Sequence, residues 1–347
     1  MREFNYSQIR SRKWDSELLG LVGAVCHEAG KHEICIKQKA AELEFFVEDA
    51  AIEDTKASNA IEGIAASGAR IGQIAWGAAP QGPDEQQIAG YFDALCLISK
   101  SFESFQLKPG TLLHLHRILL SRMDNPMAGR FKAVRNCISA VHADGQAGAI
   151  FKPLAPEEVP EAVDRICREY SLVVGNHVLS PLIAIPVFIR DFLCIHPFSN
   201  GNGRMSRLLA ALLLRQSGFH VGRYVPLNKR IAAHRDLYYD ALFASEQGWH
   251  EGADDPLPFI KHQLGVFLAS CRDFDDLYAL IEEKRPALET VRLAVQQRIG
   301  RFTKQEIRKR CPMLSLSSVE GSIRKLESLG EIMRQGAGRA TVYFRTN

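Results

Sequence analysis

The chain has 347 residues, of which 46% are hydrophobic and 24% charged, and its formal net charge is +3. This composition matches an ordinary soluble globular protein, and at this length it predicts two or three domains. The charge is unevenly distributed, because residues 288–347 hold twelve Lys or Arg against five Asp or Glu. This tail therefore carries +7 and the rest of the chain −4.

The eight cysteines lie far apart in the sequence, without a CxxC pair. Their spacing excludes a zinc knuckle and a compact disulfide framework, and it favours reduced thiols in a cytoplasmic protein. The N-terminus lacks the apolar core of a signal peptide, and prolines and charged residues interrupt the most apolar stretch, residues 178–195. We therefore expect a cytoplasmic protein with no membrane span.

The first half of the chain reads as helices joined by Gly-rich connections. Apolar periodicity predicts an amphipathic helix over 37–62, which ends at Gly63, and a long Gly- and Pro-rich connection follows over 63–83. Helical patterns return at 84–106 and 109–122. A Gly-rich, partly β-branched segment over 129–151, with turn residues at Asp144, Gly145 and Gly148, then predicts a β-hairpin or flap.

The middle of the chain predicts an all-α bundle. Its helical patterns cover 157–174, 180–195, 203–217, 230–247 and 255–270, with Gly and Pro in the intervening loops. A charged helix over 273–284 then leads to Pro286, where we expect a domain boundary.

The basic tail shows a different order of elements. It predicts helices over 288–299, 304–310 and 317–329, then strands over 331–335 and 339–345. Capping boxes mark two helix starts, Thr303 with Glu306 and Ser317 with Glu320. This order is typical of a winged-helix domain, and its positive charge favours DNA contact, although a protein-docking module fits the same pattern.

The stretch from His196 to Arg207 has the chemistry of an anion site. Gly201 and Gly203 leave room for backbone N–H groups to surround phosphate oxygens, and the helix that follows directs its positive end to the same place. Arg204 and Arg207 are three residues apart, so they share a helix face and both reach the phosphates.

His196 precedes this anion site, where an imidazole can take a proton from an attacking hydroxyl. A base beside a phosphate cradle indicates phosphoryl or nucleotidyl transfer. Each signal has a plainer reading when it is taken alone. A single Gly-Asn-Gly is commonly a turn, a histidine on an apolar helix is often a core residue, and Phe198 reads as a buried anchor.

Together, residues 196–207 resemble the Fic family signature H-x-F-x-[DE]-G-N-G-R-x-x-R at every defined position but one. The resemblance covers roughly residues 40–270, including 129–131, 151–153, 156–160 and 238–239. It implies a mainly α fold, a Fic-type helical bundle with a β-hairpin flap. The expected divisions are an N-terminal helical region (1–95), a Fic core (96–272) and a winged-helix domain (286–347).

The resemblance implies AMP transfer from ATP to a Ser, Thr or Tyr hydroxyl of a target protein, with His196 as the base and pyrophosphate leaving. The flap near 139–152 would pair with an extended target segment. The backbones of Gly201 and Gly203, together with Asn202, Arg204 and Arg207, would hold the phosphates. Tyr238 and Tyr239 would line the adenine side, or else simply pack between helices.

Asn200 stands where the family signature has Asp or Glu, which coordinates Mg²⁺. A neutral amide can ligate magnesium but supplies no charge, and Mg²⁺ prefers carboxylates together with phosphates. Three outcomes stay open: weaker metal dependence, a different nucleotide or phosphoryl donor, or a catalytically silent nucleotide sensor.

Residues Ser58 to Gly63 resemble the inhibitory motif [ST]-x-x-x-E-[GN] of one class of Fic proteins. The resemblance implies that Glu62 pairs bidentately with Arg207 and occupies the space of the γ-phosphate. The plainer alternative is an ordinary helix end with a solvated glutamate.

Two further functions remain open at this stage. One is the removal of AMP, or the transfer of phosphate, by the same site. The other is a DNA-binding regulator whose Fic-like core senses nucleotide. The sequence leaves open a homodimer, the target protein, and whether the inhibitory helix acts on its own subunit or on a neighbour.

Overall fold

The structure is a computed structural model that describes residues 2–136, 151–282, 286–296, 301–311, 314–336, 338 and 341–346. These residues are mainly helical, which confirms the predicted mainly α fold class. The helices are α1 (Ser16–Gln38), α2 (Ala40–Ile61), α3 (Gly68–Ala75), α4 (Gly82–Ser101), α5 (Pro109–Leu119), α6 (Val159–Gly175), α7 (Pro181–Ile195), α8 (Asn202–Gln216), α9 (Leu227–Ala233), α10 (Arg235–Glu246), α11 (Leu257–Glu282), α12 (Ala287–Gln296), α13 (Lys304–Arg310) and α14 (Leu316–Ser328), and the strands are β1 (Ile332–Gln335) and β2 (Val342–Arg345).

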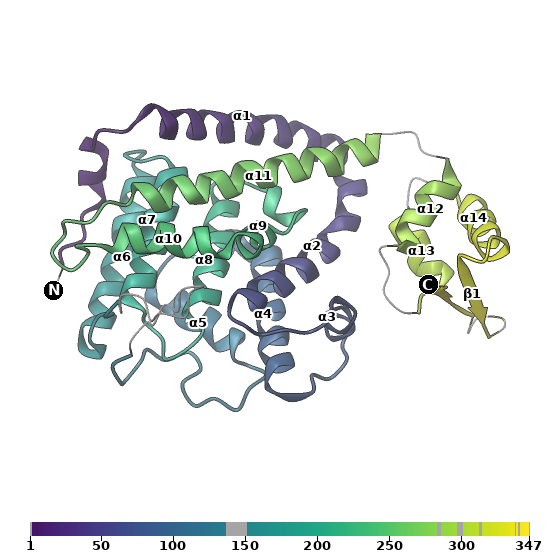
Figure 1. Ribbon diagram of the computed structural model, residues 1–347, viewed down its shortest axis with the longest axis horizontal. Helices are drawn as coiled ribbons and strands as arrows, with labels where there is room; N and C mark the ends of the chain where they lie inside the picture. Colours follow the sequence, from purple (N-terminus) through teal and green to yellow (C-terminus); the bar gives the residue numbers. More distant parts are fainter. Residues whose placement is uncertain are drawn as a thin grey trace.

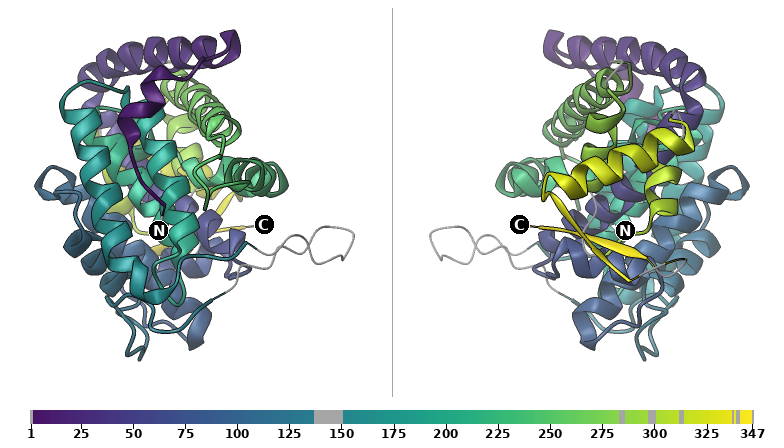
Figure 2. Two further views of the ribbon diagram at one scale, coloured as in Figure 1. Left: turned by 90° about the vertical axis from the view of Figure 1, so that its left-hand side faces the viewer. Right: turned by 90° about the vertical axis from the view of Figure 1, so that its right-hand side faces the viewer.

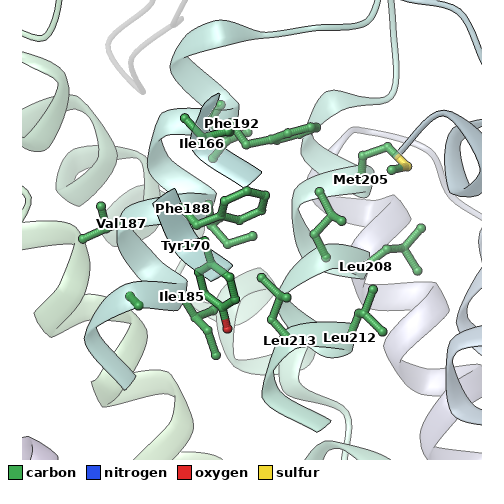
Figure 3. Close-up of a cluster of buried hydrophobic side chains, with 14 of the residues drawn as sticks. Ile166, Tyr170, Ile185, Val187, Phe188, Phe192, Met205, Leu208, Leu212 and Leu213 are labelled. Carbon is green, nitrogen blue, oxygen red and sulfur yellow. The ribbon is translucent and has the colours of Figure 1, made fainter. Parts of the chain in front are cut away.

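Helix α7 runs through the centre of the largest hydrophobic core. Ser180 caps its first turn and Pro181 occupies the first helical position, where a missing N–H costs nothing. Its side chains are buried from Leu182 to Ile195 almost without interruption, because α6, α8, α10 and α11 all pack against it. Figure 3 shows Phe188 and Phe192 of α7 lying between side chains of α6 and α8. This packing fixes the end of α7, where the candidate base stands.

Helix α1 has no counterpart in the sequence-based prediction. It packs along α11 at the outside of the bundle (Figures 1 and 2). Asp15 caps it by accepting a hydrogen bond from the N–H of Leu18 (2.9 Å), and its buried residues Leu18, Val25 and His32 recur every seven positions. The cap and this spacing were readable signals, but three glycines inside the segment weakened its helical pattern.

Three predicted boundaries in the bundle are wrong. The connection over 63–83 contains α3, which forms because Ser67 caps it and because Ile71 and Ile74 bury against α2 and α4. The helix predicted over 230–247 divides at His234 into α9 and α10. The segments over 255–270 and 273–284 form one helix, α11, since Phe274 continues its buried face.

The end of α2 has the hydrogen bonds of a Schellman motif. The N–H of Gly63 bonds to Ala60 O and that of Ile64 to Asn59 O, both at 3.0 Å. Gly63 has a φ of +76°, a left-handed conformation that glycine adopts without strain. The predicted helix end is therefore confirmed, and it places Glu62 as the residue between the helix and its glycine.

The C-terminal elements form a separate small core around Val291, Phe302, Ile323 and Tyr343 (Figure 1). β1 and β2 pair antiparallel, with Ile332 opposite Arg345. The described elements follow the predicted order of three helices and two strands, with boundaries shifted by a few residues.

Of the two capping boxes predicted in the tail, Thr303 with Glu306 is confirmed. The second is wrong. Helix α14 starts one residue earlier than expected, so Ser315 is its cap and accepts from the N–H of Ser318 (3.1 Å). Glu320 instead lies 3.7 Å from Lys304 Nζ.

Residues 137–150, which hold most of the predicted flap, lie outside the described residues, so the hairpin stays a prediction. The cysteines within the described ranges are free thiols. In the same ranges, no helix combines the length and the apolar character needed to cross a bilayer.

Candidate functional site

The loop between α7 and α8 is held in shape by its own polar groups. His196 and Gly201 both have positive φ values, 50° and 76°, which turn the chain sharply at each end of the loop. At the start of α8, directly after Gly201, the side chain of Asn202 accepts from the N–H of Phe198 (2.9 Å) and donates to Phe198 O (2.8 Å). Asn202 is 2% exposed. Its side chain therefore shapes the loop, and its backbone N–H is the group that remains for a phosphate.

Phe198 anchors the loop in the core, as predicted. Its ring is fully buried and stacks on the imidazole of His116 in α5, with the ring centroids 3.8 Å apart. His116 Nδ1 accepts from the N–H of Gly129 (3.1 Å), so Nε2 carries the proton and donates to Asn200 O (3.3 Å). Burial lowers the pKa of His116 to about 4, which keeps it in this neutral form. This role of His116 has no local signal in the sequence.

His196 is held as a neutral imidazole. It follows the last residue of α7, and its Nδ1 donates to Leu193 O (3.3 Å), which leaves the lone pair on Nε2. Burial lowers the pKa of His196 to about 4, and the nearby charge of Lys132 acts in the same direction. At neutral pH the imidazole is therefore unprotonated and can accept a proton.

The segment that follows α5 runs alongside this loop. The N–H of Lys132 donates to Pro197 O (2.8 Å), and its ammonium donates to Ile195 O (3.3 Å). Asn136 donates to Phe198 O (3.2 Å). Neither residue was predicted, because their contacts join positions about sixty residues apart and leave no local pattern.

Arg204 is a buried cation with unused hydrogen-bond donors. It lies in the first turn of α8, is 3% exposed, and donates one hydrogen bond, from Nη2 to Gln87 in α4 (2.8 Å). Its Nε and Nη1 atoms are buried without a partner among the described residues. A buried guanidinium at a helix N-terminus, where the backbone N–H groups are also free, is a site for an anion.

Arg207 is bound to the end of α2. Its Nε donates to Ser58 Oγ (2.7 Å), and its Nη2 donates to Ser58 O (2.8 Å) and to Glu62 Oε1 (2.7 Å). The expected bidentate pair with Glu62 is therefore wrong. Only Nη2 of Arg207 reaches the carboxylate, because Ser58 accepts the hydrogen bond from Nε and a second one from Nη2. Arg207 is 5% exposed, whereas the side chain of Glu62 is 30% exposed, so the contact is buried on the arginine side and partly open to solvent on the glutamate side.

The carboxylate of Glu62 lies against the start of α8. A Cβ atom built on Gly203 would overlap Glu62 Oε1. Glu62 thus places its negative charge where the free N–H groups and positive dipole end of α8 favour an anion.

A buried polar cluster holds α2 in this position. Asp54 accepts from the backbone N–H (2.8 Å) and side chain (2.7 Å) of Asn228 in α9, and Asn228 also donates to the hydroxyl of Tyr91 in α4 (3.0 Å). Burial raises the pKa of Asp54. The cluster ties α2 to two neighbouring helices and so fixes where Glu62 stands.

The two tyrosines expected near the adenine differ in their surroundings. Tyr238 is 2% exposed and packs edge-on against Phe259 of α11, which is the arrangement of a core residue. Tyr239 is partly exposed, and the guanidinium of Arg235 lies 5.3 Å from the centre of its ring. Contact of either ring with a nucleotide stays a prediction.

The residues of the loop do not build a magnesium site. Asn200 is exposed and brings an amide where the signature has a carboxylate. Within the described residues, the one cluster of His, Cys, Asp and Glu with metal-ligand spacing is Glu28, His32 and Asp275, on α1 and α11. Lys31 already bridges its two carboxylates, at 3.1 and 2.8 Å. The loop therefore offers no charge of its own to a divalent cation.

Comparison with known proteins identifies relatives of this region. The model of the Fic/DOC family matches residues 106–214. A Fido domain-containing protein of Dictyostelium discoideum is 30% identical over 101 residues, which are 29% of this chain and 66% of that protein. The protein adenylyltransferase fic-1 of Caenorhabditis elegans is 28% identical over 170 residues, 48% of this chain and 28% of that protein. The chain thus matches less than two thirds of the length of these relatives.

Solved structures share the fold. A Fic family protein from Desulfovibrio desulfuricans has a TM-score of 0.62 at 19% identity, covering 96% of this chain and 97% of that one. Fic-1 of C. elegans, residues 134–508, has a TM-score of 0.55 at 21% identity, covering 80% of this chain and 74% of that one. At these identities the likeness concerns the fold alone.

Proposed function

We propose, from the match of residues 106–214 to the Fic/DOC family model, that this chain is a protein adenylyltransferase, which moves AMP from ATP to a hydroxyl of a target protein. The observation that carries the proposal is that a neutral His196 lies at one end of the loop and Arg204 lies just beyond its other end. Arg204 keeps Nε and Nη1 without hydrogen-bond partners among the described residues. A base and an anion site so arranged suit transfer to a hydroxyl.

In the proposed reaction, Nε2 of His196 takes the proton of the target hydroxyl as its oxygen attacks the α-phosphorus of ATP. The new P–O bond joins AMP to the target, and the bond to pyrophosphate breaks. The N–H groups at the start of α8 and the free donors of Arg204 stabilise negative charge on the phosphates. Arg207 completes this anion site once it is released from Glu62.

We further propose that Glu62 inhibits the enzyme. The carboxylate is a built-in anion that competes with a phosphate for Arg207 and for the N-terminus of α8. ATP then binds in a pose that is not aligned for attack. Because the magnesium position carries Asn200, no step of this mechanism is assigned to a metal.

The experiment that tests the proposal is intact-mass measurement of the full chain after incubation with ATP, using wild type, Glu62→Gly and Glu62→Gly with His196→Ala. We expect a mass increase of whole AMP units in Glu62→Gly, little in wild type, and loss by roughly 10² to 10⁴ in the double variant. Phosphate-sized increases would instead support phosphate transfer. Equal labelling with and without His196 contradicts the proposed base.

The basic tail favours a second candidate, a DNA-binding regulator with a nucleotide-sensing core. Its described elements follow the order of a winged helix, and residues 288–347 carry +7. Salt-sensitive retardation of DNA by a chain that shows no labelling in any variant supports this candidate over the transferase.

A further inference from the structure

We propose that Lys132 is a positioning residue, which holds His196 in its left-handed backbone conformation with Nε2 available as the base. The proposal deepens the function above and rests on it. Lys132 lies between α5 and the predicted flap, outside the signature loop, and the family resemblance assigns it no role.

Lys132 forms hydrogen bonds to the residues directly before and directly after His196. The ammonium binds Ile195 O, the carbonyl before His196, and the backbone N–H binds Pro197 O, the carbonyl after it. The ammonium also donates to Asn136 Oδ1 (2.8 Å), and Asn136 in turn holds Phe198 O. One short segment thus holds the carbonyl on each side of the base and the next one along the loop.

His196 needs such a support because its conformation is unfavourable. Its φ of 50° and ψ of 62° place a residue with a Cβ in the left-handed region, which persists only where the surroundings hold it. A cation beside the last carbonyls of α7 also interacts favourably with the negative end of the helix dipole. Lys132 supplies both the constraint and this charge.

The burial of Lys132 shows that its position is specific. The residue is 3% exposed, and its ammonium is hydrogen-bonded to a carbonyl and an amide. Burying a lysine is costly, and most lysines keep their ammonium in water. Burial lowers the pKa of Lys132 to about 8, so the charge is largely present at neutral pH and disappears as the pH rises further.

The charge of Lys132 also acts on the imidazole. It lowers the pKa of His196, after the larger effect of burial, whereas the carboxylate of Glu62 at the end of α2 acts in the opposite direction. Lys132 from the segment after α5 and Glu62 from α2 are the charged groups that influence His196. Because this effect comes from the charge, replacing Lys132 by an apolar residue of similar length should raise the pKa of His196, whereas arginine at the same position should not.

The test compares Lys132→Met and Lys132→Arg with an exposed control, Lys100→Met, in the full chain. The first readout is the pKa of His196, measured by NMR titration of its imidazole. This measurement does not depend on enzyme activity. We expect Lys132→Met to raise this pKa above about 4 while burial keeps it below 6.5. Lys132→Arg and the control should leave it near the wild-type value.

The second readout is labelling kinetics in the Glu62→Gly background. Lys132→Met should lower kcat by roughly 10²-fold, as a misplaced group does, with little change in KM for ATP. Lys132→Arg should recover most of the loss. With Lys132 present, kcat should fall above about pH 8, and in Lys132→Arg that fall should be absent because a guanidinium keeps its charge.

The outcomes separate the two proposals. An unchanged His196 titration in Lys132→Met overturns the positioning role. A shifted titration in a chain that never labels supports positioning and contradicts the transferase. If Lys132→Met does not fold, Asn136→Ala removes one partner of the ammonium and the bond to Phe198 O. That variant should shift the His196 titration less, and the absence of any shift in it then overturns the role.

Discussion

At the scale of single residues, the site depends on histidines that burial keeps neutral. His116 and His196 both have pKa values of about 4, and each uses one nitrogen as a donor to a backbone carbonyl. His116 supports the loop through its contacts with Phe198, Gly129 and Asn200. The hydrogen bond that His116 accepts from the N–H of Gly129 is therefore available only while His116 stays unprotonated.

This dependence predicts that stability falls in mild acid. An unfolded histidine takes up a proton below about pH 6.5, whereas His116 in the fold does so only below about pH 4. Its contribution is therefore complete above pH 6.5 and is lost as the pH falls toward 4, by about 3 kcal/mol. Denaturant unfolding should show a flatter pH dependence for His116→Gln than for wild type in this window. Parallel curves contradict the prediction.

A second residue-scale prediction concerns Asn200. Replacing it by Asp adds a carboxylate at the exposed position where the family signature has one, and Mg²⁺ favours a carboxylate next to phosphates. In the Glu62→Gly background, Asn200→Asp should lower the Mg²⁺ concentration that gives half-maximal labelling. Ser199→Asp, at the neighbouring exposed position, is the matched control. An unchanged magnesium titration would show that the site works without this carboxylate.

At the scale of elements, the end of α2 and the start of α8 form one unit. The Schellman turn at Gly63 places Glu62, the Asp54 cluster anchors the helix, and Arg207 bonds to both Ser58 and Glu62. Because Ser58 holds two of the three hydrogen bonds to Arg207, α2 can stay docked when the carboxylate is lost. This allows the proposed inhibition to be separated from stability.

The corresponding prediction is that Glu62→Gln raises self-labelling sharply while the midpoint of thermal unfolding changes little. The amide keeps the shape of the side chain but removes the anion that competes with phosphate, and its partly exposed contact contributes little to folding. Glu53→Gln, on the exposed side of the same helix, should leave labelling at the wild-type level. Equal labelling in both variants would show that residues 58–63 are only a helix end.

At the scale of the whole molecule, the basic tail contacts the helix that carries Glu62. Arg310, at the end of α13, donates to both carboxylate oxygens of Asp49 in α2 (2.9 and 2.7 Å). The main core, in turn, takes residues from both the predicted 1–95 and 96–272 segments. The domain divisions at these positions stay predictions.

The winged-helix hypothesis predicts DNA binding by the full chain that weakens steeply with salt, because phosphate contacts release counterions. Arg324 and Lys325 of α14 carry much of the expected contact. The double variant Arg324→Ala with Lys325→Ala should reduce both the affinity and the salt slope, whereas Lys229→Ala in α9 should not. Affinity that is absent or insensitive to salt favours a protein-docking role.

The sequence by itself determined the parts of this protein whose physics is local. The candidate anion site lies within twelve consecutive residues, where glycines, two arginines and a helix start favour binding of a phosphate. The end of α2 was equally readable, since a left-handed turn there requires Gly63. The predicted helices could also be read from the sequence, because apolar periodicity is a pattern of neighbouring residues.

Only the tertiary structure decided which distant groups meet. Glu62 reaches Arg207 across 145 positions, and Lys132 reaches Ile195 across 63. Such contacts depend on how helices pack, and packing also decides burial, which sets the pKa values of His116, Lys132 and His196. Neither packing nor desolvation leaves a pattern in neighbouring residues, so the contacts proposed to position His196 and to inhibit the site are visible only in the folded chain.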